Sequence, residues 1–515
     1  MKKYYILIPI IFSFCTVFGQ TPSTYSKVKY YVGDSTTNSS IINGIVKVDS
    51  FYYLAINSLD STNSQSLGVL KTDLYGNVLE SYIQHDYNMD YFYYDGKVFI
   101  LDRDSNLLSC SSTSIHGQHR GNGYVVKMNL SLDTIWTKTL VYPDTTPGCI
   151  GNEPYLAPAA IHQTSDGGYI LTGKYYYNCI RAPESVRTFL IKLDSNGHEE
   201  WRRMYMDKSR AFSIDVTPDG GYVFPDFEQH WRIIKTDSLG NELWATQPSN
   251  SVIYAASDLI CRDNYVIAVA PYKYNNDPDP NESKYGLEIV KLDQATGQVI
   301  WNKQYRTFND ISHVTLHMDM EIVIADNEDI VIAATERAGF LNGQFYDNRG
   351  LLFKLNSQGD SLWCRFYDVR RDEDMSQFND VVVTDDGGFL AGGFVFPYDY
   401  SYWPGALLVK TDSNGMAPKA ITLDIQEYLQ KQQRGLEVYP NPTENIITFD
   451  IGKLKSFTGG LLSIYDAKGY KVRQLKLSLM VNKVDIGQLS PGVYFYHLQY
   501  SDVEFSGKFI KTNQK

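Results

Sequence analysis

Five long segments of the chain combine aromatic rings with amide, carboxylate and guanidinium groups. They span residues 102–122, 174–187, 271–285, 336–350 and 394–405, each between two β-rich runs. Binding residues concentrate on variable loops held by a rigid scaffold, and rings beside Asn, Asp and Arg suit stacking on and hydrogen bonding to sugars or peptides. We therefore expect a glycan or a surface protein to be bound by Tyr176, Tyr274, Tyr346, Arg349, Tyr400 and Trp403. The alternative is that these rings pack only against their own loops.

Signatures of catalysis and of metal binding are weak in this sequence. It has no Gly-x-Ser-x-Gly, His-Glu-x-x-His or Walker-type run, so no catalytic residue is predicted. Cys110, His116 and His119 are metal-ligand types without a second pair to complete a zinc site, and residues 277–282 lack the spacing of a calcium loop. We predict neither a metal nor a cofactor. A glycan-active hydrolase or lyase with a carboxylate pair on the loop face stays open as an alternative, as does a structural surface component.

Five of the six cysteines lie beyond the N-terminal apolar run, and an odd number cannot all pair within one chain. Cys149 and Cys179 lie in long loop segments, which makes them our candidates for a disulfide. Cys261 and Cys364 lie in strand-like runs and are expected to be plain buried residues.

Two repeated turns indicate the elements that position these segments. A Lys-x-Asp/Asn unit recurs at intervals of 43 to 65 residues, with its lysine at positions 71, 127, 192, 235, 291, 354 and 410. An Asp-Gly-Gly turn begins at Asp166, Asp219 and Asp386, with looser versions at Asp49, Asp95, Asp263 and Asn327. Short β-rich runs between such turns are hairpin signals, so each repeat is interpreted as a four-stranded meander. Both turns indicate seven repeats, which predicts an all-β, seven-bladed β-propeller.

A tryptophan lies early in the fourth strand of most repeats, at positions 136, 201, 244, 301 and 363. We interpret these rings as wedges between neighbouring sheets, and the repeated Lys and Asp as turn and blade-surface residues. The last repeat ends after Gly415 without a fourth strand, whereas residues 27–32 have no three strands before them. We therefore expect residues 27–32 to close the ring by pairing with residues 406–410.

The composition bounds the classes to which this chain can belong. A chain of 515 residues is too long for one ordinary hydrophobic core. Its 47 basic and 59 acidic residues give a net charge of -12. Nucleic-acid phosphates require clustered positive charge, so no nucleic-acid partner is predicted. Lys2 and Lys3 precede an apolar run too short for a comfortable membrane span, which predicts a secretory signal peptide and no transmembrane span. The expected domains are a signal peptide at 1–19, the propeller at 20–416, a linker at 417–435 and a C-terminal domain at 436–515.

The C-terminal domain carries four motif pieces. They are Glu-Val-Tyr-Pro-Asn-Pro at 437–442, Leu-Ser-Ile-Tyr-Asp at 462–466 followed by Gly469, Leu-Ser-Pro-Gly-Val-Tyr at 489–494, and Gly-Lys-Phe-Ile-Lys at 507–511. In order and spacing they resemble the type A C-terminal sorting domain of the type IX secretion system. The motif residues identified by this resemblance are Tyr439, Pro440, Asn441, Pro442, Gly492, Tyr494, Gly507, Lys508 and Lys511.

This resemblance implies a small immunoglobulin-like β-sandwich, which an outer-membrane translocon of Bacteroidota-type bacteria recognises and a sortase-like peptidase removes. It also implies passage through the periplasm, followed by secretion or retention at the outer cell surface. Residues 291–301 resemble the tryptophan-docking repeat of quinoprotein dehydrogenases, within a broader likeness to WD-like propellers. The adjacent cysteine pair of the quinoprotein family is missing, so only the packing analogy is kept. Together the patterns favour an exported propeller that acts as a binding or adhesion module.

Overall fold

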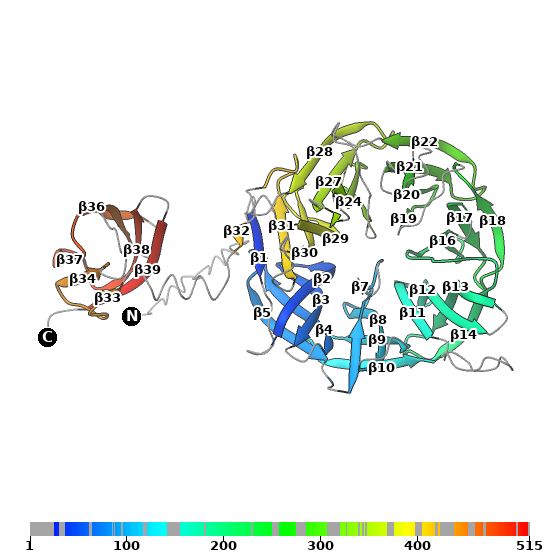
Figure 1. Ribbon diagram of the computed structural model, residues 1–515, viewed down its shortest axis with the longest axis horizontal. Coiled ribbons are helices and arrows are strands. Elements are labelled where there is room, and N and C mark those ends of the chain that lie inside the picture. Colours follow the sequence, from blue (N-terminus) through cyan, green and yellow to red (C-terminus); the bar gives the residue numbers. More distant parts are fainter. Residues whose placement is uncertain are drawn as a thin grey trace, which may run out of the picture. The chain divides into compact units, whose positions relative to one another are not determined.

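The computed structural model describes residues 25–512 except 30–36, 61–63, 85, 87, 94–95, 117–120, 142–154, 180–181, 228–229, 250–256, 274–284, 306–319, 326, 338–339, 342–343, 346–347, 368–374, 397–403, 418–420, 423–436, 452–458, 467–469 and 501–502. The chain divides into two compact units, Met1–Thr422 and Leu423–Lys515. Within the described residues all regular structure is β-sheet (Figure 1), as the sequence predicted.

The first unit is a series of antiparallel sheets, numbered here in chain order. Sheet 1 holds β2 (Thr37–Val48), β3 (Phe51–Asp60), β4 (Gln65–Asp73) and β5 (Val78–Gln84). Sheet 2 holds β6 (Met89–Phe92), β7 (Phe99–Leu101), β8 (Leu107–Ile115), β9 (Gly121–Met128) and β10 (Thr134–Leu140). Sheet 3 holds β11 (Tyr155–Gln163), β12 (Tyr169–Cys179), β13 (Ala182–Leu193) and β14 (Glu199–Tyr205). Sheet 4 holds β15 (Asp215–Val216), β16 (Tyr222–Asp226), β17 (Arg232–Thr236) and β18 (Glu242–Thr246).

The later sheets continue the same order. Sheet 5 holds β19 (Asp258–Cys261), β20 (Tyr265–Lys273), β21 (Tyr285–Asp293) and β22 (Val299–Tyr305). Sheet 6 holds β23 (Glu321–Ile324), β24 (Ile330–Arg337), β27 (Asn348–Leu355) and β28 (Ser361–Tyr367), with a small hairpin of β25 (Phe340–Leu341) and β26 (Gln344–Phe345) between its middle strands. Sheet 7 holds β29 (Met375–Val383), β30 (Phe389–Phe396), β31 (Gly405–Thr411), β1 (Tyr25–Lys29) and β32 (Ile421–Thr422).

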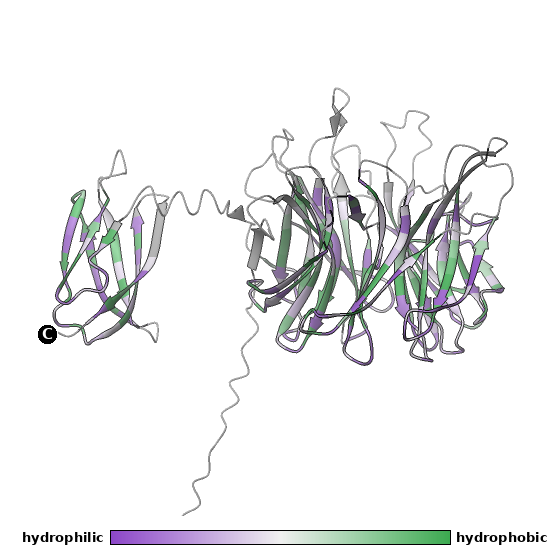
Figure 2. Ribbon diagram, turned by 90° about the horizontal axis from the view of Figure 1, so that it is seen from below, coloured by the Kyte–Doolittle hydropathy of each residue, from purple (hydrophilic) through white to green (hydrophobic). Residues whose placement is uncertain are grey.

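These sheets form a β-propeller. Figure 1 shows them arranged in a ring, with β2, β7, β11, β19 and β29 toward the centre and β5, β10, β14, β18, β22 and β28 at the rim. Hydrophobic residues recur along the strands (Figure 2), and their buried members form the clusters between and within sheets. The predicted four-stranded meander is therefore confirmed for this unit.

The N-terminal strand closes the ring. β1 pairs antiparallel with β31, with Lys27 opposite Leu408 and Lys29 opposite Ala406. β32 adds a further strand, parallel to β1, which the sequence did not indicate. Sheet 7 also contacts sheet 1 directly, because Asn379 Nδ2 donates a 2.8 Å hydrogen bond to Ile42 O. The predicted closure is confirmed for β1, and residues 30–32 of the predicted strand lie outside the described residues.

The repeated tryptophans fill the gaps between neighbouring sheets, as predicted. An ideal Cβ placed on Gly197, Gly297, Gly359 or Gly415 would lie 2.7–3.0 Å from the indole ring of Trp136, Trp244, Trp301 or Trp363 of the preceding sheet, respectively. These four glycines also have positive φ angles, which only glycine adopts readily. Each tight turn therefore needs its glycine both for its backbone conformation and for the close approach of the tryptophan.

Four of the repeated lysines are buried and the other three are half-buried, which corrects the prediction that they lie on the blade surface. Lys192 Nζ lies 2.9 Å from Asp166 Oδ2, and Lys410 Nζ lies 2.8 Å from Asp386 Oδ2, in each case joining the two turns of one sheet. The aspartates of the Lys-x-Asp units do lie in turns, where Asp237 Oδ1 accepts hydrogen bonds from the backbone N–H of Leu239 and Asn241. A lysine stem packs well among apolar residues when its ammonium group has an acidic partner.

Two predicted boundaries in this unit are wrong. The first turn of sheet 2 is at residues 102–106, where Asp102 N donates to Asn106 O, and not at Asp95. Residues 107–115 are therefore the strand β8 and not part of a long loop. Likewise β12 and β13 extend across most of residues 174–187, so that Tyr175 is a buried core residue. The three tyrosines at 175–177 favour an extended strand, so the hairpin of sheet 3 is longer than we predicted.

The second unit is a small β-sandwich. One sheet holds β33 (Glu437–Tyr439), β34 (Ile446–Asp450) and β37 (Val481–Asp485). The other holds β35 (Gly460–Tyr465), β36 (Lys471–Leu477), β38 (Gly492–Tyr500) and β39 (Val503–Lys511). Both sheets contribute to one hydrophobic core, which includes Phe449, Ile464 and Leu498. This unit thus has a core of its own, as the predicted sandwich requires.

Candidate functional site

The inner strands of the propeller bring charged side chains to its central channel. Lys97 lies two residues before β7 in sheet 2, whereas Glu321 begins β23 in sheet 6. Lys97 Nζ lies 3.0 Å from Glu321 Oε1. Because sheets 2 and 6 are not neighbours in the ring, this ion pair spans the channel. An ideal Cβ on Gly96 would lie 2.1 Å from Phe212 O, so the backbone just before Lys97 packs closely against sheet 4.

Two further carboxylates near Lys97 tie neighbouring sheets together. Asp380 Oδ2 accepts a 2.5 Å hydrogen bond from Ile45 N, which joins sheet 7 to sheet 1. Asp258 Oδ2 accepts a 2.8 Å bond from Ile322 N, and Asp258 Oδ1 accepts a 2.5 Å bond from Ser213 Oγ. Asp258 therefore links sheets 4, 5 and 6. These hydrogen bonds hold the two carboxylates in place between neighbouring sheets.

Burial and mutual repulsion shift the protonation of this cluster. Burial raises the pKa of Asp380 to about 7, although the Lys97 ammonium opposes this shift. Burial, followed by repulsion from Asp258, raises the pKa of Glu321 well above its usual value. The negative charge of Glu321 in turn raises the pKa of Lys97. Lys97 therefore stays charged. The raised pKa values of the neighbouring acids mean that not every one of these acids is ionised at the same time.

A cavity of about 300 Å³ lies in the channel at the end that leads into the Asp-Gly turns. Its wall includes Lys97, His162, Asp215 and Arg262 among aliphatic side chains of the inner strands. Val383 and Ile324, which also line it, stand just before the first turns of sheets 7 and 6. The cavity therefore opens toward the face of short turns, opposite to the face on which we predicted binding.

His162 and Asp215 contact each other on the cavity wall. His162 Nε2 lies 3.0 Å from Asp215 Oδ1, and His162 Nδ1 lies 2.9 Å from Gln163 O. Asp215 Oδ2 accepts a 2.8 Å hydrogen bond from Cys261 N. Burial alone would raise the pKa of Asp215, but the hydrogen bond and charge of His162 lower it below its usual value. These contacts join sheets 3, 4 and 5 and leave both groups fully engaged with protein atoms.

Arg262 differs from the other charged groups of the cavity. Its Nη1 donates a 3.3 Å hydrogen bond to Cys261 O, the carbonyl oxygen of the preceding residue. Among the described residues, no carboxylate lies within ion-pair distance of its guanidinium group. Arg262 is exposed and lines the cavity, so most of its donors face solvent there.

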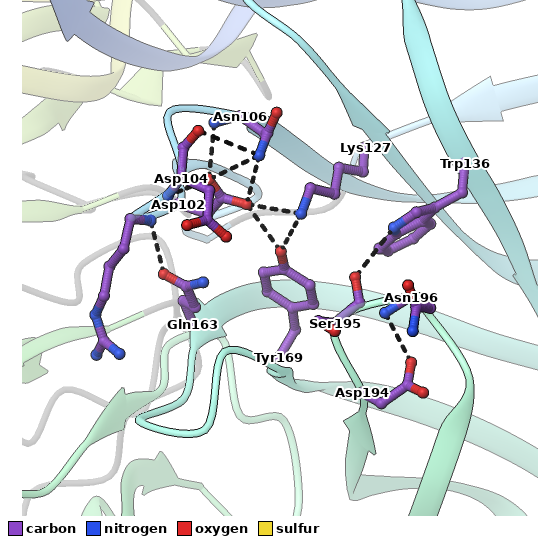
Figure 3. A network of polar contacts seen from close by, with 11 residues as sticks. Asp102, Asp104, Asn106, Lys127, Trp136, Gln163, Tyr169, Asp194, Ser195 and Asn196 are labelled. Carbon is purple, nitrogen blue, oxygen red and sulfur yellow. Dashed lines mark hydrogen bonds and ion pairs between the residues drawn. The ribbon is translucent and has the colours of Figure 1, made fainter.

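A separate polar network holds sheets 2 and 3 together (Figure 3). Asp102 Oδ2 lies 2.9 Å from Lys127 Nζ and accepts a 2.9 Å hydrogen bond from Tyr169 OH. Lys127 Nζ also donates a 2.8 Å bond to Tyr169 OH. Burial would raise the pKa of Asp102, but hydrogen bonds from Lys127, Asn106 and Tyr169 lower it. All three groups are buried, so this network serves the fold rather than a ligand.

The residues predicted to bind a ligand are only partly described. Tyr274, Tyr346, Tyr400 and Trp403 lie outside the described residues. The backbone of Tyr176 belongs to β12 and pairs with Tyr155 and Val186, so it lies in a strand and not in the predicted loop. Arg349 lies in β27, where its guanidinium carbon is 4.8 Å from the centre of the Phe366 ring. Their part in binding stays a prediction.

The residues behind the cysteine and metal predictions are also only partly described. Cys149 lies outside the described residues, and nothing is described of the Cys179 side chain, so their predicted disulfide stays untested. Cys261 is buried in β19 and Cys364 is half-buried in β28, both as free thiols. Cys110 belongs to the hydrophobic core of the propeller. In the described part of the chain, no three His, Cys, Asp or Glu side chains are grouped as a metal site.

The motif pieces of the second unit come together in space. Asn441 Nδ2 donates a 3.2 Å hydrogen bond to Lys508 O, and Asn441 Oδ1 accepts a 2.9 Å bond from Ile510 N. The segment around Pro440 and Pro442 is thereby fixed to the last strand. Lys511 Nζ donates to Glu444 O in the same region.

The third motif piece joins the last strand through aromatic packing. The Tyr494 ring stacks on Phe509 with ring centres 5.6 Å apart, and Tyr494 OH donates a 2.7 Å hydrogen bond to Ser490 O. An ideal Cβ on Gly507 would lie 2.4 Å from Tyr496 OH, so only glycine fits there without displacing that ring. Gly492 begins β38. Much of the motif thus maintains the fold of the sandwich.

Several solved structures are similar to this chain. Among solved structures, the chain is similar to a polysaccharide lyase of a family described as ulvan lyase (8% identity, 70% of this chain and 93% of that chain, TM-score 0.41). It is also similar to the Neurospora crassa Pan2 WD40 domain (9%, 73% and 89%, TM-score 0.39) and to an α-L-arabinofuranosidase from Fusarium graminearum (11%, 76% and 98%, TM-score 0.40). No curated protein matches the sequence. At these low identities and scores, the comparisons carry no argument about activity.

One family model matches part of the chain with a defined role. Residues 437–512 match the secretion system C-terminal sorting domain, which confirms the resemblance seen in the sequence. No helix among the described residues is long and apolar enough to cross a membrane. The second unit is therefore a sorting domain, which directs export by the type IX secretion system to the cell surface or the extracellular space.

Proposed function

We propose that this chain is an exported, seven-bladed β-propeller that acts as a binding or adhesion module. The proposed domains are a signal peptide at 1–19, the propeller at 20–416, a linker at 417–435 and the sorting domain at 436–515. The described sheets of the first unit support the blade number, and the closing strand β1 supports a complete ring. The proposed partners are the type IX translocon and a sortase-like peptidase, together with a glycan or surface protein as the ligand.

The observation that carries the export half of this proposal is the spatial assembly of the sorting motif. Asn441 connects the first piece to the last strand, and the family model spans the same residues. The sandwich also has its own hydrophobic core, so a translocon can recognise it without contacting the propeller. A compact, separately folded C-terminal unit is suited to removal after export.

The channel geometry favours binding over catalysis. A glycan-active hydrolase needs two carboxylates that are free to exchange protons and to face a substrate. In the described channel, Asp258 and Asp380 each accept backbone hydrogen bonds from a neighbouring sheet, and Glu321 pairs with Lys97. Asp215 is likewise engaged by His162 and Cys261 N. We therefore place binding ahead of hydrolysis or lysis in this proposal.

Export is tested by removing the sorting domain in a bacterium that has a type IX secretion system. A chain ending at residue 436 is expected to fold and to accumulate in the periplasm, while the full chain appears outside the cell. A matched pair of point variants refines the test: Asn441→Ala, which breaks the link between motif pieces, and Lys471→Ala, on the exposed strand β36 of the same sandwich. Only the first is expected to reduce export.

The results that contradict the proposal are equally concrete. Normal export of the chain that ends at residue 436 would show that the second unit is not the sorting signal. Equal export of the two point variants would show that the motif assembly is not what the translocon reads. Removal of the domain is checked by mass spectrometry of the surface form, where full-length protein would contradict processing.

A further inference from the structure

The charged side chains that line the channel cavity differ in whether a described group of opposite charge lies beside them. Lys97 is paired with Glu321 across the channel, and His162 is paired with Asp215 on the wall. Arg262 has only the carbonyl oxygen of Cys261 as its partner among the described residues. Within the cavity lining, the guanidinium group of Arg262 is therefore the cation whose charge is not matched by a described carboxylate.

The arrangement of N–H donors in a guanidinium group indicates which class of ligand Arg262 can bind. A guanidinium group presents parallel N–H donors in a plane, and this fork matches the two oxygens of a carboxylate. One weak bond to a backbone carbonyl leaves the remaining donors of Arg262 available. Two parallel hydrogen bonds can form at once to a carboxylate or to two oxygens of a tetrahedral anion, so the body of the ligand must be inferred from the rest of the cavity wall.

The rest of the cavity wall is apolar. Ile214, Leu259, Ile260, Ile322, Ile324 and Val382 line it beside the charged groups. Ile322 is fully buried, and its strand is held in place by the hydrogen bond from Ile322 N to Asp258. The cavity volume of about 300 Å³ is at the lower limit of small-molecule sites. These aliphatic side chains offer a compact hydrocarbon body an apolar contact beside the polar surface of the charged groups.

We propose that the cavity at the short-turn end of the channel binds a small carboxylate with a compact apolar body, which Arg262 holds by its guanidinium group. This inference rests on the proposed function as a binding module and names the ligand class for one of its sites. The Lys97–Glu321 ion pair spans the channel beside the cavity, so the ligand enters from the face of short turns. Binding by the residues predicted from the long segments is a separate prediction.

Binding is measured by calorimetry on the purified full chain with benzoate and cyclohexanecarboxylate as probes. Their neutral amides, benzamide and cyclohexanecarboxamide, keep the apolar body and lose the charge. Sulfate is the tetrahedral anion for comparison. The inference predicts binding of at least one of the two carboxylates and weaker binding of both amides and of sulfate.

The decisive variants are Arg262→Gln and Arg262→Lys. Arg365 provides a matched control, because its Nη1 donates a 3.2 Å bond to the carbonyl of the preceding residue in the same manner, but it lies on the outer strand β28. Arg262→Gln is expected to weaken carboxylate binding by about tenfold or more, and Arg262→Lys by less, since the charge remains without the fork. Arg365→Gln is expected to bind as the wild type does. Circular dichroism checks that each variant is folded.

Failure of this inference is distinguishable from failure of the proposed function. Absence of carboxylate binding to the wild type, or unchanged binding by folded Arg262→Gln, would overturn the cavity assignment. Neither result would affect export or capture of surface glycans, which are measured separately on the same full chain. Tighter binding of sulfate than of both carboxylates would also overturn the inference, because it would show that the apolar body of the carboxylates does not contribute to binding.

Discussion

Lys410 Nζ lies 2.8 Å from Asp386 Oδ2, and this ion pair joins the two repeated turns of one sheet. Asp386 belongs to the turn between the first two strands, whereas Lys410 ends the third strand just before the next turn. The same pairing recurs as Lys192 with Asp166, and Lys235 with Asp219. The two sequence repeats are thus physically coupled, and the lysine has a structural role in each sheet where the pair forms.

A buried pair of this kind contributes more to stability than an exposed pair. The Asp102 side chain is 0% exposed and that of its partner Lys127 8%, whereas Asp360, which pairs with Lys303, is 62% exposed. Lys127→Ala is expected to lower the free energy of unfolding by about 3 kcal/mol or more, because Asp102 is left buried without its cation. Lys303→Ala is expected to change it by less than about 1 kcal/mol. Denaturant unfolding of both variants measures the difference, and equal effects would contradict the assigned role of the network.

Acid is expected to weaken the ion pair of Asp166. Burial would raise the pKa of Asp166, but hydrogen bonds from Thr164 and Lys192 lower it to about 2. A carboxylate with a lowered pKa contributes stability that is present above its unfolded value and is lost as the pH falls through the folded value. The difference in Tm between the wild type and Asp166→Asn is therefore expected to shrink between about pH 4 and about pH 2.

Asp104→Asn provides the control for this titration, because the Asp104 carboxylate forms no ion pair with the described residues. Its Tm is expected to follow that of the wild type over the same pH range. If the difference between the wild type and Asp166→Asn is constant with pH, the ion pair with Lys192 does not contribute to stability in solution.

Ring closure by β1 predicts a strong effect of a short deletion. β1 pairs with β31 over five residues and separates β31 from β32. Removal of residues 21–33 exposes the edge of β31 and leaves sheet 7 without its outer strands. We expect a clear decrease in the Tm of the propeller, measured by calorimetry. An unchanged melting curve would show that the ring is stable without this strand.

The close contact between Gly507 and Tyr496 predicts a local defect in the sorting domain. A Cβ at position 507 would overlap the Tyr496 hydroxyl. Gly507→Val is expected to destabilise the sandwich by roughly 1–3 kcal/mol, and the double variant with Tyr496→Ala is expected to lose less stability than the sum of the two single variants. Thermal unfolding should show the change in the transition of the second unit alone. Additive effects of the two substitutions would mean that the residues are not in contact.

The sequence predicted the repeats, the wedge tryptophans and the closing strand because each depends on local signals. Positive-φ glycines such as Gly197 and Gly415 mark the turns, and an indole ring near the start of the fourth strand packs against them. The edge strand β1 could be inferred because its partner, β31, lacked one in the linear sequence. These features follow from spacing along the chain.

The channel cluster was missed because it depends on which inner strands face one another across the ring. Glu321 and Asp380 stand at equivalent places, each four residues before the backbone N–H that closes the first turn of its sheet, at Ala325 and Thr384. Alignment of the repeats on that turn would have shown an acidic residue recurring at this position of the first strand. Lys97 carries no such signal, since the inner edge of sheet 2 is divided between β6 and β7.

The most direct test of this account transfers the sorting domain to another protein. Residues 437–515 are fused to the C-terminus of a folded periplasmic carrier and expressed in a bacterium that has a type IX secretion system. The account predicts that the carrier appears outside the cell, and that the same fusion with Asn441→Ala stays largely in the periplasm. Retention of the unaltered fusion in the periplasm, in cells that export the full chain, would contradict the claim that the second unit alone directs export.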